Sequence, residues 1–173
     1  MSVQQHTPYA AAAAFIAEQP RPLVTVPARC ALVGPTAVEV RLGGRLVAVD
    51  EPHTLGGQGT APTPEQYALA ALGACEAISF RYWSGRLAIP FDELRVEVRG
   101  DIELGASLGL APGARPGYGA VRIAVRLQGP APAERYDALL HAVDEHASVL
   151  DVFRNEVHVQ TGIAIQPPPR ERS

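Results

Sequence analysis

The segment from Pro64 to about Arg86 constrains the fold most, because it has the composition of a long buried helix. Thr63 is a favourable N-cap, Pro64 fits the first helical turn, and Gln66 completes a Thr-x-x-Gln capping box. Every residue from Ala68 to Cys75 is apolar or small. A helix that is hydrophobic on all sides is buried rather than exposed. The sequence therefore predicts a central helix that the rest of the fold encloses.

Strands are predicted both before and after this helix in the sequence. Leu94–Glu103 and Val121–Leu127 alternate between apolar and polar residues, which is typical of half-buried strands. Gly43 and Gly44 form a two-residue hairpin signal. The expected strands are Leu23–Val33, Ala37–Leu42, Arg45–Asp50, Leu94–Glu103, Val121–Leu127 and Val157–Ile165. Their order around the helices predicts an α+β fold with antiparallel sheets.

Length and helix-breaking residues predict one domain with short appendages. A chain of 173 residues fits a single domain. Residues 1–22 are expected to form an N-terminal extension with a helix over Pro8–Glu18, and residues 167–173 a disordered tail. The domain between them, residues 23–166, is expected to hold a second amphipathic helix from Tyr136 to Ala147.

Composition excludes several functional classes. The net charge is −3 with the charges dispersed along the chain, which argues against a nucleic-acid partner. No stretch reaches the roughly 18 apolar residues of a membrane span, and the Ala-rich run Tyr9–Ala17 lacks the charged entry region of a signal peptide. We therefore expect a cytoplasmic protein with reduced thiols. No cofactor or metal is expected, because His141 and His146 are five positions apart and no ligand set accompanies them.

The two cysteines, Cys30 and Cys75, are too few for a disulfide scaffold. By itself, Cys75 is a small apolar residue that fills space in a buried helix. Glu65, in the first helical turn, interacts favourably with the helix dipole. The preceding Gly-rich loop lacks the Lys-Ser/Thr ending of a phosphate-binding loop, and Pro62 removes a backbone donor from it. None of these residues taken singly indicates catalysis.

Their combination is more specific. The stretch DEPHTLGGQGTAPTPEQYALAALGAC, Asp50–Cys75, resembles the OsmC/Ohr superfamily of osmotically inducible protein C and organic hydroperoxide resistance proteins. That pattern has a Gly-rich loop, an Asn-Pro-Glu motif, and a Cys ten residues after the Glu. Here Thr63 replaces the Asn, and the spacing from Glu65 to Cys75 is retained. The resemblance continues through LRVEVRGDI and the second amphipathic helix.

The resemblance implies antiparallel sheets packed on a central buried helix in an intertwined homodimer. It also implies thiol-dependent reduction of organic hydroperoxides. Cys75 would be the peroxidatic residue, and Glu65 would help to orient the site. In one helix, ten positions separate two residues by about 15 Å along the axis. A shared site therefore needs either an unwound start to the helix or a Glu65 from the other subunit.

The sequence departs from the family pattern at the resolving cysteine, which family peroxidases carry in the second helix. The corresponding segment here is HASVLDVFRN, with Ala147 at the resolving position and Ser148 in place of a Pro. We therefore expect a divergent, one-cysteine peroxidase that is recycled by an external thiol. Cys30 remains open as a distant resolver.

The family's active-site Arg has no clear counterpart either. His53 lies in the right loop, either as its substitute or as a solvated loop residue. These departures leave an alternative function open. The chain could be a non-catalytic dimeric protein of the same fold that binds a small apolar or sulfur-containing ligand.

Overall fold

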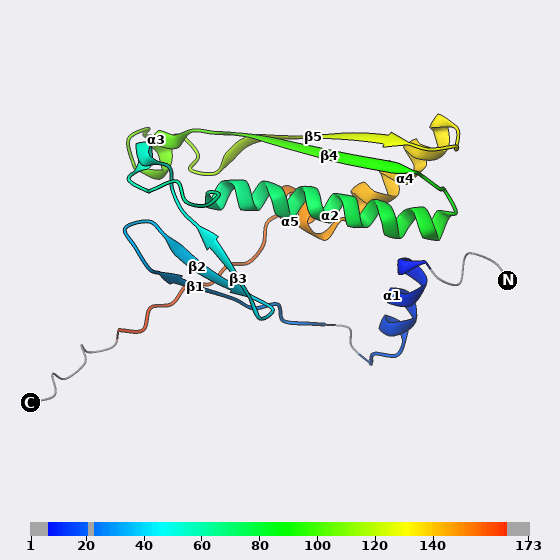
Figure 1. The fold of residues 1–173 in the computed structure, drawn as a ribbon, viewed down its shortest axis with the longest axis horizontal. Helices are drawn as coiled ribbons and strands as arrows, with labels where there is room; N and C mark the ends of the chain where they lie inside the picture. Colours follow the sequence, from blue (N-terminus) through cyan, green and yellow to red (C-terminus); the bar gives the residue numbers. More distant parts are fainter. Residues whose placement is uncertain (1–6, 21–22, 166–173) are drawn as a thin grey trace, which may run out of the picture.

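The computed structural model describes residues 7–20 and 23–165 (Figure 1). The elements follow in the order α1 (Pro8–Ala17), β1 (Ala28–Leu32), β2 (Val38–Leu42), β3 (Arg45–Val49), the short 3₁₀ helix η2 (His53–Leu55), α2 (Pro64–Leu87), β4 (Glu93–Ile102), α3 (Leu104–Ser107), β5 (Tyr118–Gln128), α4 (Ala133–His146) and α5 (Ser148–Arg154). The expected disordered tail, residues 167–173, lies outside the described residues, as do residues 1–6 and 21–22 of the expected extension. This order confirms the predicted α+β class.

The start of α2 is fixed by the predicted capping box. The Thr63 hydroxyl accepts a hydrogen bond from the Gln66 N–H at 3.4 Å, and the Gln66 side chain accepts one from the Thr63 N–H at 3.0 Å. The helix then runs unbroken to Leu87 and ends at Ala88, which adopts a left-handed conformation with φ of 51°. The side chains of Thr63 and Gln66 thus determine where α2 begins.

The strands form two separate antiparallel sheets. β1, β2 and β3 make a three-stranded sheet in chain order, and β4 pairs with β5. Gly43 and Gly44 both have positive φ, 51° and 81°, so they form the predicted two-residue hairpin turn between β2 and β3. β1 is shorter than the predicted strand, because residues 23–27 pair with no strand in the part of the chain that the structure describes.

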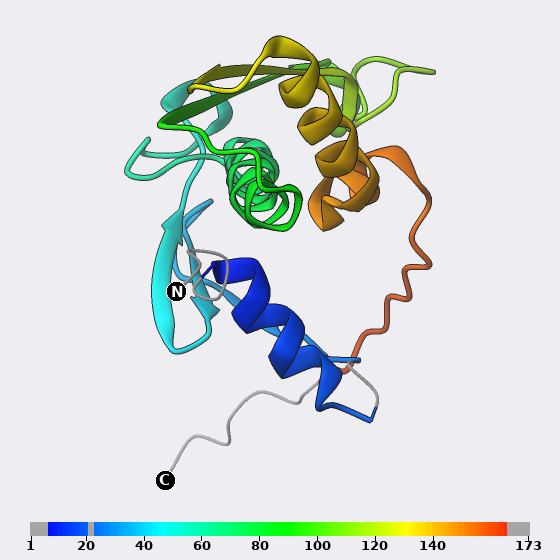
Figure 2. The ribbon, with the colours of Figure 1, turned by 90° about the vertical axis from the view of Figure 1, so that its right-hand side faces the viewer.

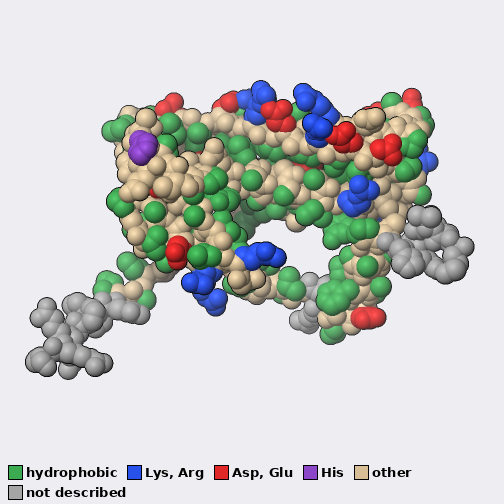
Figure 3. Space-filling view, viewed as in Figure 1, with side chains coloured by type: hydrophobic (Ala, Val, Ile, Leu, Met, Phe, Trp, Pro, Cys, Tyr) green, Lys and Arg blue, Asp and Glu red, His purple; other side chains and the backbone are tan. Residues whose placement is uncertain are grey.

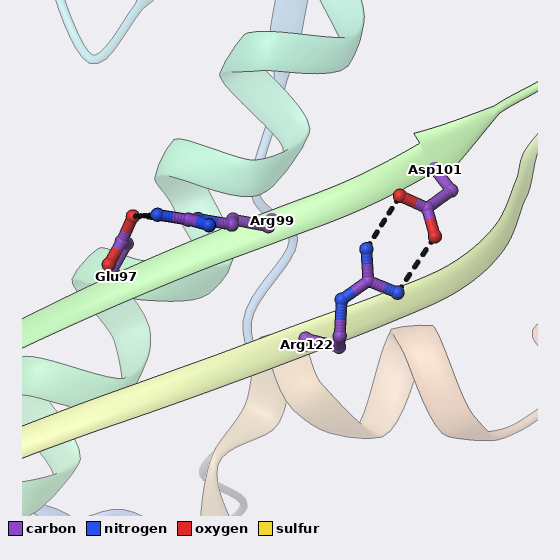
Figure 4. Close-up of polar contacts among 4 residues, drawn as sticks. All are labelled: Glu97, Arg99, Asp101 and Arg122. Atoms are coloured by element: carbon purple, nitrogen blue, oxygen red, sulfur yellow. Dashed lines mark hydrogen bonds and ion pairs between the residues drawn. The ribbon is translucent and has the colours of Figure 1, made fainter.

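The β4–β5 pair has one apolar face and one charged face. The apolar side chains of Val96, Val98 and Ile123 are half-buried, and the residues between them are exposed. On the exposed face Arg122 forms a bidentate ion pair with Asp101 at 2.6 and 2.7 Å, and Glu97 pairs with Arg99 (Figure 4). The charged side chains crowd one edge of the molecule (Figure 3). Exposed pairs of this kind stabilise a fold by at most about 1 kcal/mol each, so the apolar face holds the sheet in place.

The core lies where α2, α4 and α5 meet the apolar face of this sheet. α2 runs along the sheet, and α4 lies beside α2 under the same face (Figure 2). The buried apolar side chains are Leu72, Phe80, Ile89, Phe91, Leu139, Val143, Ala147 and Leu150. At the other end of the molecule, α1 packs its Tyr9 against Trp83 and Arg86 near the end of α2.

Within one chain, α2 is buried along one stripe rather than on all sides. The stripe contains Leu72, Glu76 and Phe80, whereas Ile78 is 55% exposed. The space-filling view shows an opening between α2 and the three-stranded sheet with α1 (Figure 3). The expectation of a fully enclosed helix is therefore not confirmed by a single chain. Within the described part of the chain, no helix is both long and apolar enough to cross a membrane.

The strand predicted over Val157–Ile165 is wrong for the single chain. The segment carries strand-like alternation but pairs with no strand among the described residues, and Val159 and Ile163 are 78% and 88% exposed. After α5 the segment runs away from the β4–β5 pair toward the three-stranded sheet (Figure 1). A strand needs a neighbouring edge for its N–H and C=O groups, and sequence alternation alone supplies none.

Candidate active site

Cys75 lies on α2 at the point where α5 begins. Its sulfur is 3.7 Å from the Ser148 hydroxyl oxygen and accepts a hydrogen bond from the Val149 N–H at 3.4 Å. Cys75 is half-buried, whereas Ser148 is exposed. The thiol therefore has two hydrogen-bonding neighbours at the start of α5 and remains accessible to small molecules.

The break between α4 and α5 directs these donors at the sulfur. Ala147 ends α4 with an extended backbone, ψ of 105°, and serves at the same time as the N-cap of α5. Its own N–H bonds to the Val143 carbonyl, and its side chain is buried in the core. The first N–H groups of a new helix have no carbonyl partners in that helix. The Val149 N–H is one of these, and the Cys75 sulfur is its acceptor.

This arrangement suits a sulfur nucleophile. The thiolate is the reactive form of cysteine, and donors at a helix start together with a hydroxyl stabilise negative charge on sulfur. Neither group that contacts Cys75 is charged. Among the described residues, the polar contacts of the sulfur are therefore hydrogen bonds with a hydroxyl and a backbone N–H, and no arginine is among them.

Sequence analysis missed Ser148 as a site residue. It assigned the resolving position to Ala147, whose side chain points into the core, whereas the Ser148 hydroxyl lies nearest to the sulfur. The only available signal was that Ser148 follows Ala147 in the segment aligned with the family's second helix. Cys30 is an exposed free thiol on β1, in the three-stranded sheet, and belongs to a different part of the fold from Cys75.

Glu65 lies at the first turn of α2, in a second cluster of polar side chains. The Tyr118 hydroxyl donates a 2.7 Å hydrogen bond to the Glu65 backbone carbonyl. Burial, and then the negative charge of Glu65, raises the pKa of Tyr118. Burial raises the pKa of Glu51, with further contributions from Glu65 and then Asp50. Glu65 therefore belongs to an acidic group at the start of the helix.

The structure does not bring Glu65 and Cys75 together within one chain. Both lie on the unbroken helix α2, so their ten-residue separation corresponds to about 15 Å along the axis. The capping box at Thr63 shows that the start of the helix is fully wound. The alternative of an unwound start is therefore wrong. Of the two routes to a shared site, only a Glu65 from a second subunit remains.

The loop before α2 is organised around Asp50. This buried carboxylate accepts hydrogen bonds from the hydroxyls of Thr36 and Thr60 at 2.7 and 2.9 Å. It also accepts from the backbone N–H groups of Glu51, Gln58 and Thr60 at 2.9–3.2 Å. These hydrogen bonds, with that from Thr36 the strongest contribution, hold the pKa of Asp50 far below its usual range. The loop is thus fixed from its two ends.

His53 makes its hydrogen bond within this loop rather than to the thiol. Its Nδ1 atom is 3.1 Å from the Gly57 carbonyl oxygen, and the residue is exposed in η2. Gly57 is buried, and a side chain at this position would collide with the Glu51 backbone. The Gly-rich composition therefore allows the loop to pack closely on itself, which agrees with the solvated-loop interpretation of His53.

The comparisons with known proteins fit this fold. The model of the OsmC-like protein family matches residues 57–162. An OsmC-like protein from Mycoplasma pneumoniae superposes with a TM-score of 0.66 at 13% identity, over 76% of this chain and 88% of that one. An organic hydroperoxide resistance protein from Legionella pneumophila superposes with a TM-score of 0.60 at 21% identity, over 78% and 92% of the two chains.

A third similar structure is an organic hydroperoxide resistance protein from Elizabethkingia anophelis with thiocyanate bound. Its TM-score is 0.60 at 19% identity, over 78% of this chain and 91% of that one. No curated protein matches the sequence significantly. At these identities the structural likeness shows the fold, and the family model covers more than half of the sequence. The chain belongs to the OsmC-like family.

Proposed function

We propose that the protein is a thiol-dependent peroxidase that reduces organic hydroperoxides through Cys75. The observation that carries this proposal is the placement of the Cys75 sulfur at the start of α5, where the Val149 N–H and the Ser148 hydroxyl lie against it. Such a sulfur is open to a small substrate and is supplied with hydrogen-bond donors for its anionic form. The hydroperoxide resistance proteins among the similar folds support the substrate class.

The reaction has two stages. In the first, the Cys75 thiolate attacks the terminal oxygen of R–O–O–H, forming an S–O bond and breaking the O–O bond. The leaving alkoxide takes up a proton to become the alcohol, and the cysteine becomes a sulfenic acid. In the second stage an external thiol condenses with the sulfenic acid, releasing water and forming a mixed disulfide. A second external thiol then attacks this disulfide and regenerates Cys75.

The one-cysteine form of the reaction follows from the group beside the sulfur. Ser148 stands there, and a hydroxyl cannot form a disulfide with the oxidised cysteine. Cys30 lies on β1 in the three-stranded sheet, away from α2 and α5, so it supplies no nearby resolving thiol in this chain. The cytoplasm, where small thiols are abundant and reduced, would supply the reductant.

We further propose that the working unit is an intertwined homodimer in which Glu65 of one subunit serves Cys75 of the other. The fully wound α2 keeps these residues apart in one chain. Exposed apolar side chains on α2 and on the segment after α5, Ile78, Val159 and Ile163, provide surface for a second copy to cover. In this unit, residues 23–166 form the family domain, and residues 1–22 extend it.

Oxidation of the intact protein by cumene hydroperoxide tests the peroxidase proposal. We expect one sulfenic acid per chain, trapped by a dimedone-type reagent and located at Cys75 by mass spectrometry. Cys75→Ser should lose both the modification and the thiol-dependent turnover, because the attacking sulfur is gone. Cys30→Ser is the matched control and should keep both. Turnover that survives in Cys75→Ser would refute the proposal and favour the non-catalytic binding alternative.

A further inference from the structure

A cavity of about 880 Å³ lies between α2, β5, α4 and α5, and Cys75 is not among its lining residues. Its apolar walls come from Leu72 on α2, Val121 and Ile123 on β5, and Leu150 and Phe153 on α5. Sites for small organic ligands in proteins typically enclose about 300–1,000 Å³. The cavity is therefore large enough for a small molecule and lies apart from the thiol.

One buried carboxylate oxygen in this wall has no hydrogen-bond partner among the described residues. The Glu76 residue is 1% exposed, and its Oε1 atom accepts no hydrogen bond from any of the described residues. Burial, and then the negative charge of Asp144, raises the pKa of Glu76, whereas Arg154 lowers it. A buried polar atom without a hydrogen bond is costly and is rare in native proteins. Glu76 therefore lacks the donor that its position requires.

Two carboxylates, Glu76 and Asp144, and two guanidiniums, Arg115 and Arg154, line the cavity. Of these groups, Asp144 on α4 and Arg154 on α5 act on the charge of Glu76. Arg154 already donates to Asp144, at 3.1 Å to the side chain and 3.4 Å to the backbone carbonyl. Neither of these hydrogen bonds goes to Glu76, so its buried Oε1 atom has no hydrogen-bonded cation among the described residues.

We propose that this cavity binds a small primary amine with an apolar tail, its ammonium group on the Glu76 carboxylate and its tail against Leu72, Ile123 and Leu150. An ammonium supplies three donors, including the one that Glu76 lacks, and a positive charge that strengthens the hydrogen bond to a carboxylate. An alcohol of the same length supplies one donor and no charge. A carboxylate of that length offers no donor to Glu76 and is repelled by its charge.

The amine site and the proposed peroxidase chemistry can be tested separately. Cys75 does not line the cavity, so Cys75→Ser should bind an amine as tightly as the parent protein does. Failure of amine binding would leave the peroxidase proposal untouched, and failure of peroxide reduction would leave the amine site untouched.

Isothermal titration of the full chain with hexylamine, 1-hexanol and hexanoate tests the proposal. We expect hexylamine to bind at least about tenfold more tightly than the other two, because charged hydrogen bonds contribute more than neutral ones. Glu76→Gln should weaken hexylamine at least about tenfold by removing the charge from the site. Glu145→Gln, the same change on the exposed face of α4 where Glu145 pairs with His141, should leave the affinity unchanged.

A second measurement on the unmutated protein keeps the test decisive if Glu76→Gln does not fold. Nuclear Overhauser contacts should join the hexylamine chain to the methyl groups of Leu72, Ile123 and Leu150. The proposal is overturned if hexylamine does not bind, if hexanoate binds as tightly, or if the contacts fall on other methyl groups. Unchanged affinity in a folded Glu76→Gln protein would overturn it equally.

Discussion

At the scale of single residues, Asp50 has the clearest structural role. It directly follows β3 and accepts hydrogen bonds from Thr36 on one side and from Gln58 and Thr60 on the other. It thereby connects the three-stranded sheet to the loop that leads into α2. An aspartate in a Gly-rich loop gave no sequence signal for this role, because its partners lie up to fourteen residues away.

Asp50→Asn should destabilise the protein at neutral pH. The amide nitrogen of Asn cannot accept the N–H bonds that Gln58 and Thr60 donate. The folded-state pKa of Asp50 is lowered, so its contribution is fully present above the unfolded-state value of about 3.9 and declines as the pH falls below it. Urea unfolding should therefore show a difference between parent and variant that shrinks below about pH 4. Asp92→Asn, at an exposed carboxylate, is the control and should change the free energy of unfolding at neutral pH much less than Asp50→Asn does.

At the scale of helices and strands, the local sequence predicted where a helix starts and where a hairpin turns. It did not predict which distant residues come into contact. Thr63 and Gln66 predicted the start of α2, and Gly43-Gly44 predicted the β2–β3 hairpin, because each of these features depends on residues only a few positions apart. The contact between Ser148 and Cys75 joins residues 73 positions apart, so no local pattern could reveal it. The second helix was predicted as far as Ala147, where α4 does end, but the new helix α5 that starts at Ser148 was not predicted.

Thr63→Ala should weaken the start of α2. The substitution removes the acceptor for the Gln66 N–H, and loss of such a cap typically costs about 1 kcal/mol in the free energy of unfolding. Chemical denaturation with circular dichroism measures the change. Thr54→Ala, an exposed threonine in η2, serves as the matched control. Equal losses in the two variants would show that the capping box contributes nothing specific.

At the scale of the whole molecule, a single chain leaves apolar surface without cover. The strand expected over Val157–Ile165 and the fully enclosed α2 are the two predictions that one chain does not meet. Both were inferred from apolar residues that must be buried somewhere. The sequence indicates that these residues need burial, but it does not say which chain provides it. In the proposed intertwined dimer, the second subunit would cover both the Val157–Ile165 segment and the exposed side of α2.

Mixed dimers test whether Glu65 acts across subunits. Cys75→Ser and Glu65→Ala proteins, each inactive alone, should recover activity when unfolded together and refolded as an equimolar mixture. Half of the dimers would then be mixed, each with one complete site, giving about a quarter of the parent activity for a two-fold symmetric dimer. No recovery, although mass spectrometry detects mixed dimers, would place Glu65 outside the site of the neighbouring subunit. Light scattering that finds only monomers would exclude the dimer itself.

The position of α5 has a consequence for how this protein can change. One side of this short helix holds Ser148 and Val149 against the Cys75 sulfur, while Leu150 and Phe153 form part of the cavity wall. A substitution on α5 that reshapes the cavity for a larger or smaller occupant is therefore expected also to shift the groups that touch the sulfur. We expect laboratory selection for a new cavity ligand to alter the rate of Cys75 alkylation as a by-product, so the two properties cannot be tuned separately through this helix.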